Sequence, residues 1–197
     1  NILEDQIVAL EPEAQSAAVF NSGMAAITTL FFAVCQPGTS FVYTTPLYGG
    51  TYHFIHQMLE RFGVTGIPAA AGNTAQMRDA IRTAPNLRLV FIETPANPTL
   101  VMSDIAAAAE AAHSLPEPAL VAVDNTLLGP VLQHPLALNA DLAVYSATKY
   151  LSGFSDLLAG IILGKNPEIL EELRGLRAIL GNILQPDECW MLDGRLP

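Results

Sequence analysis

The sequence predicts an α/β fold, a three-layer α/β/α sandwich in which helices cover both faces of a mostly parallel mixed sheet. Strand-like and helix-like stretches alternate through all 197 residues, an order typical of parallel strands joined by helical crossovers. Several strand-like stretches are almost wholly apolar, as expected of strands that are buried on both faces. No repeat and no internal linker interrupts this pattern. We therefore expect one domain over residues 1–197.

The individual elements follow from hydrophobic spacing and from turn residues. Apolar residues at helical spacing predict helices at residues 2–10, 22–35, 52–62, 74–83, 104–113 and 167–180. Short apolar runs bounded by Gly, Pro or Asp predict strands at residues 41–45, 64–67, 87–92, 119–123, 142–145 and 160–163. Ser103 is the expected N-cap of the helix at residues 104–113.

Composition excludes several classes of partner. Half of the residues are hydrophobic (51%), 14% are charged, and the formal net charge is −10. This balance argues against nucleic acid and against anionic membranes, which require clustered Lys and Arg. Cys35 and Cys189 stand far apart without a CxxC pattern, so we expect no disulfide framework, no metal site and a cytoplasmic protein. The chain begins at Asn1 and ends without a clear stop, which suggests a segment of a longer protein.

A long stretch without charge runs from Ala14 to Leu59. A membrane span is a poor explanation, because polar residues such as Asn21 and Gln36 interrupt any run of sufficient length. A helix buried in a core or in a subunit interface fits better. We therefore expect self-association through this region.

Polar side chains follow four of the predicted strands. Tyr48, Asn97 and Asp124 each come shortly after an apolar run, and residues 146–149 follow a fourth. In open parallel sheets, ligands bind beyond the carboxyl ends of the strands. The sequence thus predicts a small-molecule site built from these residues.

Lys149 is one of only two lysines in the chain, and it stands between two apolar runs. Lys165 occupies a polar turn, GKNPE, and needs no special explanation. A lysine enclosed by apolar residues has either a partner or a lowered pKa, and such an amine can form Schiff bases. The alternative is a stem that packs while its ammonium reaches water.

A second feature is the Ser22-Gly23-Met24 sequence at the start of a predicted helix. The free backbone N–H groups of a helix start bind anions, and glycine allows close approach. Ser146 and Thr148 add hydroxyl groups, so the set suits a phosphate. A simple N-cap at Ser22 is the alternative.

Asp124 is the only charged residue between Pro118 and Ala140. A carboxylate at the end of an apolar strand needs a cationic or donor partner, and a protonated ring nitrogen would serve. Tyr48 offers an aromatic face and Asn97 a hydrogen bond to a ring oxygen. Together with a phosphate site and a reactive lysine, these groups describe pyridoxal 5′-phosphate, PLP.

Five motifs in order and spacing resemble the Cys/Met-metabolism family of PLP-dependent enzymes, and the resemblance covers nearly the whole chain. The motifs are SGMAAI (22–27), LYGGTY (47–52), ETPANP (93–98), VDNT (123–126) and YSATKYLSGFSDLLAG (145–160). The family includes methionine γ-lyase, cystathionine γ-lyase and cystathionine γ-synthase. The resemblance implies the large domain of a fold-type I PLP-dependent enzyme.

The resemblance also implies roles for matching residues. Lys149 would be the Schiff-base lysine and the proton shuttle. Tyr48 would stack on the ring and assist proton transfer, Asp124 would pair with the ring nitrogen, and Asn97 would lie near the ring hydroxyl. The implied phosphate ligands are Ser22, Gly23, Met24, Ser146 and Thr148.

The activity implied is γ-elimination on a sulfur amino acid such as methionine or cystathionine, giving a 2-oxo acid, ammonia and a thiol. Replacement at Cγ of an activated homoserine is the alternative. The family also implies a homotetramer whose active sites are built at a dimer interface.

Several departures from the family pattern concern the substrate. The family's Tyr-x-Arg segment, which reaches the neighbouring subunit's phosphate, would precede Asn1, and the arginine that holds the substrate carboxylate would follow Pro197. Gly129 stands where Thr or Ser is usual, and Phe154 where His is common. Gly50 replaces a cysteine of well-known methionine γ-lyases, whereas TYHFIH (51–56) favours a lyase.

Three rival functions remain to be weighed. Tyr145 and Lys149 match the Tyr-x-x-x-Lys pair of short-chain dehydrogenases, which requires one helix face and a Gly-rich dinucleotide turn. The sequence contains no such turn. The second rival is a serine hydrolase, and the sequence contains no GxSxG motif for its nucleophile. A non-catalytic paralogue that acts as an interaction domain is the third rival, and the intact set of cofactor residues argues against it.

Overall fold

The computed structural model describes residues 2–196 and confirms the α/β class. Seven strands form a mixed sheet in the order β1-β7-β6-β5-β4-β2-β3. The strands are β1 Ser16–Phe20, β2 Ser40–Thr45, β3 Thr65–Ala70, β4 Leu87–Glu93, β5 Leu120–Asp124, β6 Leu142–Ser146 and β7 Gly160–Gly164. The helices are α1 Ile2–Val8, α2 Gly23–Val34, α3 Gly49–Gln57, α4 Thr74–Thr83, α5 Ile105–His113, α6 Gly129–Leu132, α7 Pro167–Leu180 and α8 Pro186–Asp193, with 3-10 turns at Leu59–Phe62 and Leu136–Leu138.

The chain forms two compact units, each assembled from separate segments. The first unit holds the residues up to Ala33, Asn125–Ala137 and the chain from Asp141 onward. The second holds Val34–Asp124 and Leu138–Ala140. The single-domain organisation expected from the sequence remains a prediction.

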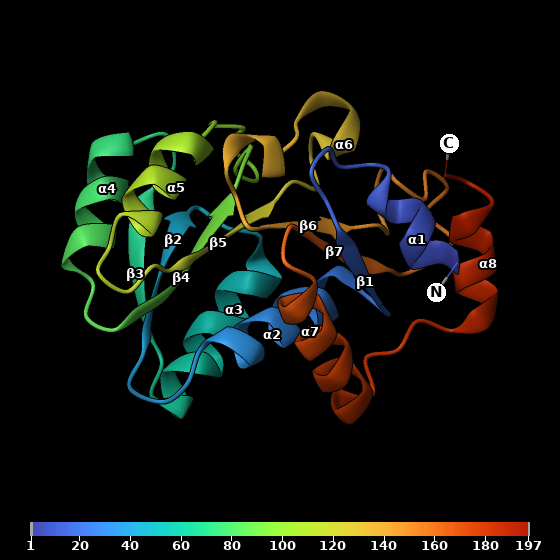
Figure 1. Ribbon diagram of the computed structural model, residues 1–197, viewed down its shortest axis with the longest axis horizontal. Helices are drawn as coiled ribbons and strands as arrows, with labels where there is room; N and C mark the ends of the chain where they lie inside the picture. The colour runs from blue at the N-terminus through green and yellow to red at the C-terminus, as the bar shows by residue number, and fades with distance from the viewer. Residues whose placement is uncertain (1, 197) are drawn as a thin grey trace. The chain divides into compact units, whose positions relative to one another are not determined.

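In the second unit, four parallel strands lie in the order β5-β4-β2-β3. Helices α4 and α5 lie side by side (Figure 1) and pack on one face of these strands. The residues that make this layer are apolar and buried, among them Val42, Ile81, Val90, Ile105 and Val121. Tyr43, which alternates with Val42 on β2, contacts His56 of α3, so α3 covers the opposite face. This unit therefore has three layers.

In the first unit, β7 lies between β1 and β6 and is antiparallel to both. Helices α1 and α8 pack against each other (Figure 1), and the core beneath them includes Leu3, Val19, Tyr145, Ile161 and Leu192. Helix α7 packs on β1 and β7 through its buried Leu170 and Leu173.

A buried glutamate connects α1, β1 and α7 within the first unit. Glu4 of α1 accepts a hydrogen bond from the Val19 backbone N–H (3.1 Å) and one from Arg177 Nη1 of α7 (2.8 Å). Its other oxygen lies 3.5 Å from Arg174 Nε. The charge is thus paired and hydrogen-bonded, as a buried carboxylate requires.

The predicted helices at residues 74–83 and 167–180 are confirmed residue for residue. Asn73 and Asn166 cap their first turns, and Gly181 ends the second helix in a left-handed conformation with φ 73°. The cap predicted for α5 was wrong by one position. Asp104 accepts the Ala107 N–H, whereas the Ser103 hydroxyl accepts the Gly72 N–H.

Other boundaries also differ from the prediction. The sequence analysis missed β1, because all five of its residues are buried and SAAVF shows no alternation. It also missed α6 and α8. Helix α3 begins at Gly49, three residues before the predicted start, and stops at Gln57, after which a 3-10 turn follows. Within residues 2–196, no helix combines the length and apolar character that crossing a bilayer demands.

Candidate functional site

Lys149 lies in the turn that joins β6 to β7. Its backbone N–H donates to the Ser146 carbonyl (3.1 Å), and its own carbonyl accepts from Gly153 N–H (3.0 Å). The residue is exposed, so the expectation that apolar runs enclose it was wrong. Those runs are the strands β6 and β7, and the turn between them reaches the surface. The burial argument for a reactive amine therefore fails, and the identification depends on the surroundings of this turn.

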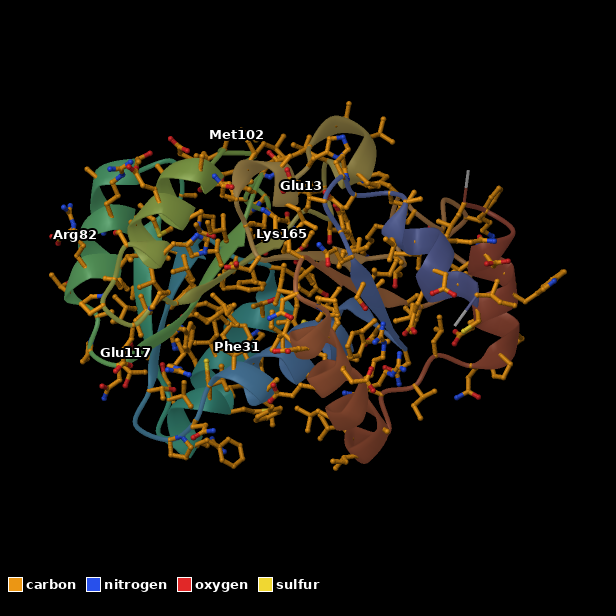
Figure 2. All side chains as sticks on the ribbon, viewed as in Figure 1. Glu13, Phe31, Arg82, Met102, Glu117 and Lys165 are labelled. Carbon is orange, nitrogen blue, oxygen red and sulfur yellow. The ribbon has the colours of Figure 1, made fainter. Side chains whose placement is uncertain are left out.

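The other lysine has an ordinary structural role. Lys165 Nζ lies 3.0 Å from Glu13 Oε2, and both residues are labelled in Figure 2. Both belong to the first unit. Lys165 is therefore a suitable control residue for experiments on Lys149.

The start of α2 lies against the end of β6. A Cβ atom on Gly23 would fall 2.7 Å from Ser146 Cβ and 2.9 Å from Ser146 Oγ, closer than real side chains approach. Glycine therefore allows this helix start to meet Ser146. Helix α2 has 12 residues, so its first turn carries the positive end of the helix dipole.

Two predicted phosphate ligands have structural partners in this chain. The Ser22 hydroxyl accepts the Ala25 N–H (3.0 Å), which is the N-cap alternative. Thr148 Oγ1 accepts the Ala159 N–H (3.0 Å) and donates to the Ala159 carbonyl (3.3 Å), so it fastens the turn to the residue before β7. The Ser146 backbone N–H donates to Thr126 Oγ1 (2.8 Å), which places Thr126, the last residue of the VDNT motif, beside the start of the lysine turn.

In the second unit, one glutamate connects two of the predicted ring-binding segments. Glu93, the last residue of β4, accepts the Tyr48 N–H at Oε2 (2.8 Å) and the Asn97 N–H at Oε1 (2.9 Å). The side chains of Tyr48 and Asn97 are themselves exposed. Glu93 pairs with Asp124 in the register of β4 and β5, so two carboxylates stand side by side at the carboxyl end of these strands.

Glu93 is the residue that the sequence analysis missed. Burial, together with the neighbouring Asp124, raises the pKa of the carboxyl to about 7, although the two backbone N–H donors lower it. The signal was present in the sequence, because Glu93 ends an apolar strand just as Asp124 does. Like Asp124, Glu93 is a carboxylate at the end of an apolar strand and needs a donor or a cation as partner.

Tyr145 serves a buried polar network of the first unit. Its hydroxyl donates to Glu11 Oε1 and accepts from Asn125 Nδ2 (3.0 Å). Tyr145 belongs to β6 and Lys149 to the following turn, so the two do not share a helix face. The dehydrogenase interpretation of this pair is therefore contradicted.

The residues present fit PLP in the chemistry of their donor set. The first unit offers a helix start beside Ser146, where glycine allows close approach, and it carries the exposed amine of Lys149 in the following turn. The second unit offers an exposed phenol at Tyr48, an exposed amide at Asn97 and a buried carboxylate at Asp124. These are groups for a phosphate, an aldehyde and an aromatic ring with a basic nitrogen.

Comparison with known proteins agrees with this set of PLP-compatible groups. The model of the Cys/Met metabolism PLP-dependent enzyme family matches residues 1–194. The chain is 37% identical to L-methionine gamma-lyase of Pseudomonas deceptionensis over 193 residues, which are 97% of this chain and 47% of that protein. It is 39% identical to cystathionine gamma-synthase/O-acetylhomoserine (thiol)-lyase of Bacillus subtilis, over 97% of this chain and 50% of the other.

A solved structure shows the same fold. The crystal structure of metB from Corynebacterium glutamicum superposes with a TM-score of 0.93 at 34% identity, covering 98% of this chain and 49% of that one. The chain thus spans about half the length of the relatives it matches. The family match extends over nearly all of its residues. The chain belongs to the Cys/Met metabolism PLP-dependent enzyme family.

Proposed function

We propose that this protein is a PLP-dependent carbon–sulfur lyase that carries out γ-elimination on a sulfur amino acid such as methionine or cystathionine. The observation that carries the proposal is the Lys149 turn, which follows Ser146 at the point where Gly23 opens α2. Curated relatives named methionine gamma-lyase and cystathionine gamma-lyase support the elimination.

When bound, PLP supplies an aldehyde that condenses with amines and a ring that accepts electrons from the substrate Cα. The backbone N–H groups of Gly23 and Met24 would bind its phosphate, together with the Ser146 hydroxyl. Thr148 would contribute by holding the turn, and Ser22 by capping α2, because their hydroxyls already have backbone partners. This refines the roles expected for Ser22 and Thr148.

Lys149 Nζ would hold the cofactor between turnovers and move the proton. It would take the proton from the substrate Cα and return a proton to the substrate at a later step. Asp124 would keep the ring nitrogen protonated, and Tyr48 would cover the ring and assist the leaving thiol. Asn97 would donate to the ring oxygen. Hydrolysis by one water molecule would complete the reaction, so that methionine and water yield 2-oxobutanoate, ammonia and methanethiol.

A replacement reaction on an activated homoserine is the second candidate. The 39% identity to cystathionine gamma-synthase/O-acetylhomoserine (thiol)-lyase favours it. So does Gly50, which stands where well-known methionine γ-lyases have cysteine. Both reactions use the same groups and differ in whether a thiol leaves or enters.

Location and assembly belong to the proposal as well. Cys35 and Cys189 are free thiols, which is consistent with the expected cytoplasmic location. The family resemblance supports a homo-oligomer, expected to be a tetramer, and an amino acid as its small-molecule partner.

The test is to supply PLP and offer the protein methionine, cystathionine, cysteine, homocysteine and O-acetylhomoserine with cysteine. Release of 2-oxobutanoate or pyruvate with a thiol supports elimination, whereas cystathionine formed from O-acetylhomoserine supports replacement. Lys165→Ala serves as the control variant and should keep the activity that Lys149→Ala loses. If wild type and Lys149→Ala turn over equally, the proposal is wrong.

A further inference from the structure

Glu93 bridges two segments that come from different strands. Oε2 accepts the N–H of Tyr48, which follows β2, and Oε1 accepts the N–H of Asn97, which follows β4. Each carboxylate oxygen thus holds one segment, at 2.8 Å and 2.9 Å. Burial raises the pKa of Glu93 to about 7, so the acceptor is ionised above that pH. Hydrogen bonds to an ionised acceptor are stronger than neutral ones, and the bridge then connects the two segments firmly.

The backbone of Glu93 is itself held in place by a buried hydrogen bond. The Glu93 backbone N–H donates to Thr44 Oγ1 of β2 (2.9 Å), and Thr44 is fully buried. Glu93 is only 5% exposed. Tyr48 is the N-cap residue of α3 and has no side-chain cap of its own, so Glu93, when ionised, also places negative charge at the start of that helix.

The two bridged residues expose their side chains while their backbones are held. Tyr48 is 47% exposed, and the Asn97 side chain also reaches the surface. Glu93 is therefore too buried to contact a ligand. Its hydrogen bonds fix the backbone positions from which the side chains of Tyr48 and Asn97 extend.

The position of Glu93 is costly for a purely structural bridge. Its partner in the strand register is Asp124, which is also buried (9% exposed). Like charges opposite each other on neighbouring strands destabilise a sheet, and burial of a carboxylate requires compensation. The two backbone N–H groups provide compensation, and the arrangement brings Asp124, Tyr48 and Asn97 around one residue.

We propose that Glu93 is a positioning residue, whose carboxylate ties the Tyr48 segment to the Asn97 segment and so fixes both side chains for the PLP ring. This role rests on the proposed function. Glu93 itself touches neither cofactor nor substrate.

The experiment compares Glu93→Gln and Glu93→Leu with wild type in the full chain. Glutamine keeps the size but has one acceptor oxygen, so its amide group faces the second N–H with another donor. Leucine removes both acceptors. Glu11→Gln is the matched control, since it changes a buried glutamate in the other unit. Far-UV circular dichroism confirms that each variant is folded.

The first measurement is hydrogen exchange at the amides of Tyr48 and Asn97, without PLP and at about pH 8, where the Glu93 carboxylate is ionised. We expect at least one of the two to exchange about tenfold faster in Glu93→Gln and both in Glu93→Leu, with no change in Glu11→Gln. Unchanged exchange in both Glu93 variants overturns the bridge, whatever the protein's function.

The second measurement is the affinity for PLP and the visible circular dichroism of the bound cofactor, which reports how the ring is held. We expect Glu93→Gln to bind PLP about tenfold to a hundredfold more weakly, as loss of one charge-assisted hydrogen bond implies, and to lose dichroism per bound cofactor. Faster exchange with unchanged affinity and dichroism would make Glu93 merely structural. If wild type takes up no PLP, the proposed function itself fails, and this outcome is distinct from failure of Glu93 alone.

Discussion

Gly23 and Ser146 lie so close together that a methyl group on Gly23 would fall 2.7 Å from the Ser146 Cβ atom. This contact joins the first turn of α2 to the end of β6, where the lysine turn begins. It gives the SGM motif a structural reason that does not depend on any ligand. It also keeps the Ser146 hydroxyl beside helix-start N–H groups, which is the arrangement an anion requires.

Replacing Gly23 with alanine should therefore disturb this contact. We expect Gly23→Ala to lower the free energy of unfolding by about 1–3 kcal/mol, the usual cost of overpacking, and to weaken PLP binding. Urea unfolding and PLP titration measure the two effects.

Gly175→Ala is the matched control for that substitution. Gly175 lies within α7, and a methyl group on it would meet no atom within 4 Å beyond its own helix backbone, so alanine should stabilise the protein by about 0.5–1 kcal/mol. If Gly23→Ala behaves like Gly175→Ala, the close contact with Ser146 is not a constraint.

The paired charge at Glu4 should matter for stability rather than for chemistry. Glu4→Ala leaves the Val19 N–H without its acceptor and leaves Arg177 without its carboxylate partner, while the Val19 carbonyl still accepts from Nη1. Breaking a buried ion pair costs about 3–5 kcal/mol, so the urea midpoint should fall sharply. Glu168→Ala, an exposed change on α7, should leave the midpoint nearly unaltered. Equal midpoints for the two variants would contradict the role assigned to Glu4.

The stability of the cofactor-free protein should depend on two buried acids. Burial raises the pKa of Glu11 to about 7, although the Tyr145 hydroxyl opposes the shift, and burial likewise raises that of Glu93 to about 7. Near pH 6 the folded state then binds protons that the unfolded state, with a carboxyl pKa of 4.5, has released. The free energy of unfolding should therefore decrease as the pH rises from about 4.5 to about 7.

Glu11→Gln isolates the contribution of one of these acids, because glutamine does not titrate. Urea unfolding at several pH values between about 5 and 8 should give a flatter dependence for the variant than for wild type. Identical slopes would mean that Glu11 has the same proton affinity in both states.

Several elements could be predicted because their signals are local. Helices α4 and α7 begin with an asparagine cap and have amphipathic faces, and their bounds matched the prediction. Strand β1 lacked such a signal, since a strand buried on both faces shows no alternation. The cap of α5 was ambiguous because Ser103 and Asp104 are both good caps, and only the structure shows that Gly72 uses the serine.

The candidate site was predictable in its motifs but not in its contacts. The exposure of Lys149 could not be anticipated, because apolar neighbours in sequence say nothing about which way a turn faces. The bridge from Glu93 to Tyr48 spans 45 residues and uses a backbone N–H, which no side-chain pattern reveals. Ser22 and Thr148 were predicted among the phosphate-binding residues, yet the partners of their hydroxyls in this chain are backbone groups.

The central claim is that Lys149 is the residue to which PLP attaches. The direct measurement is to mix the protein with PLP, reduce with borohydride, digest, and locate the added mass by peptide sequencing. We predict the label on Lys149, with the same yield in Lys165→Ala and none in Lys149→Ala. A label on Lys165, or equal labelling of both lysines, would contradict the account.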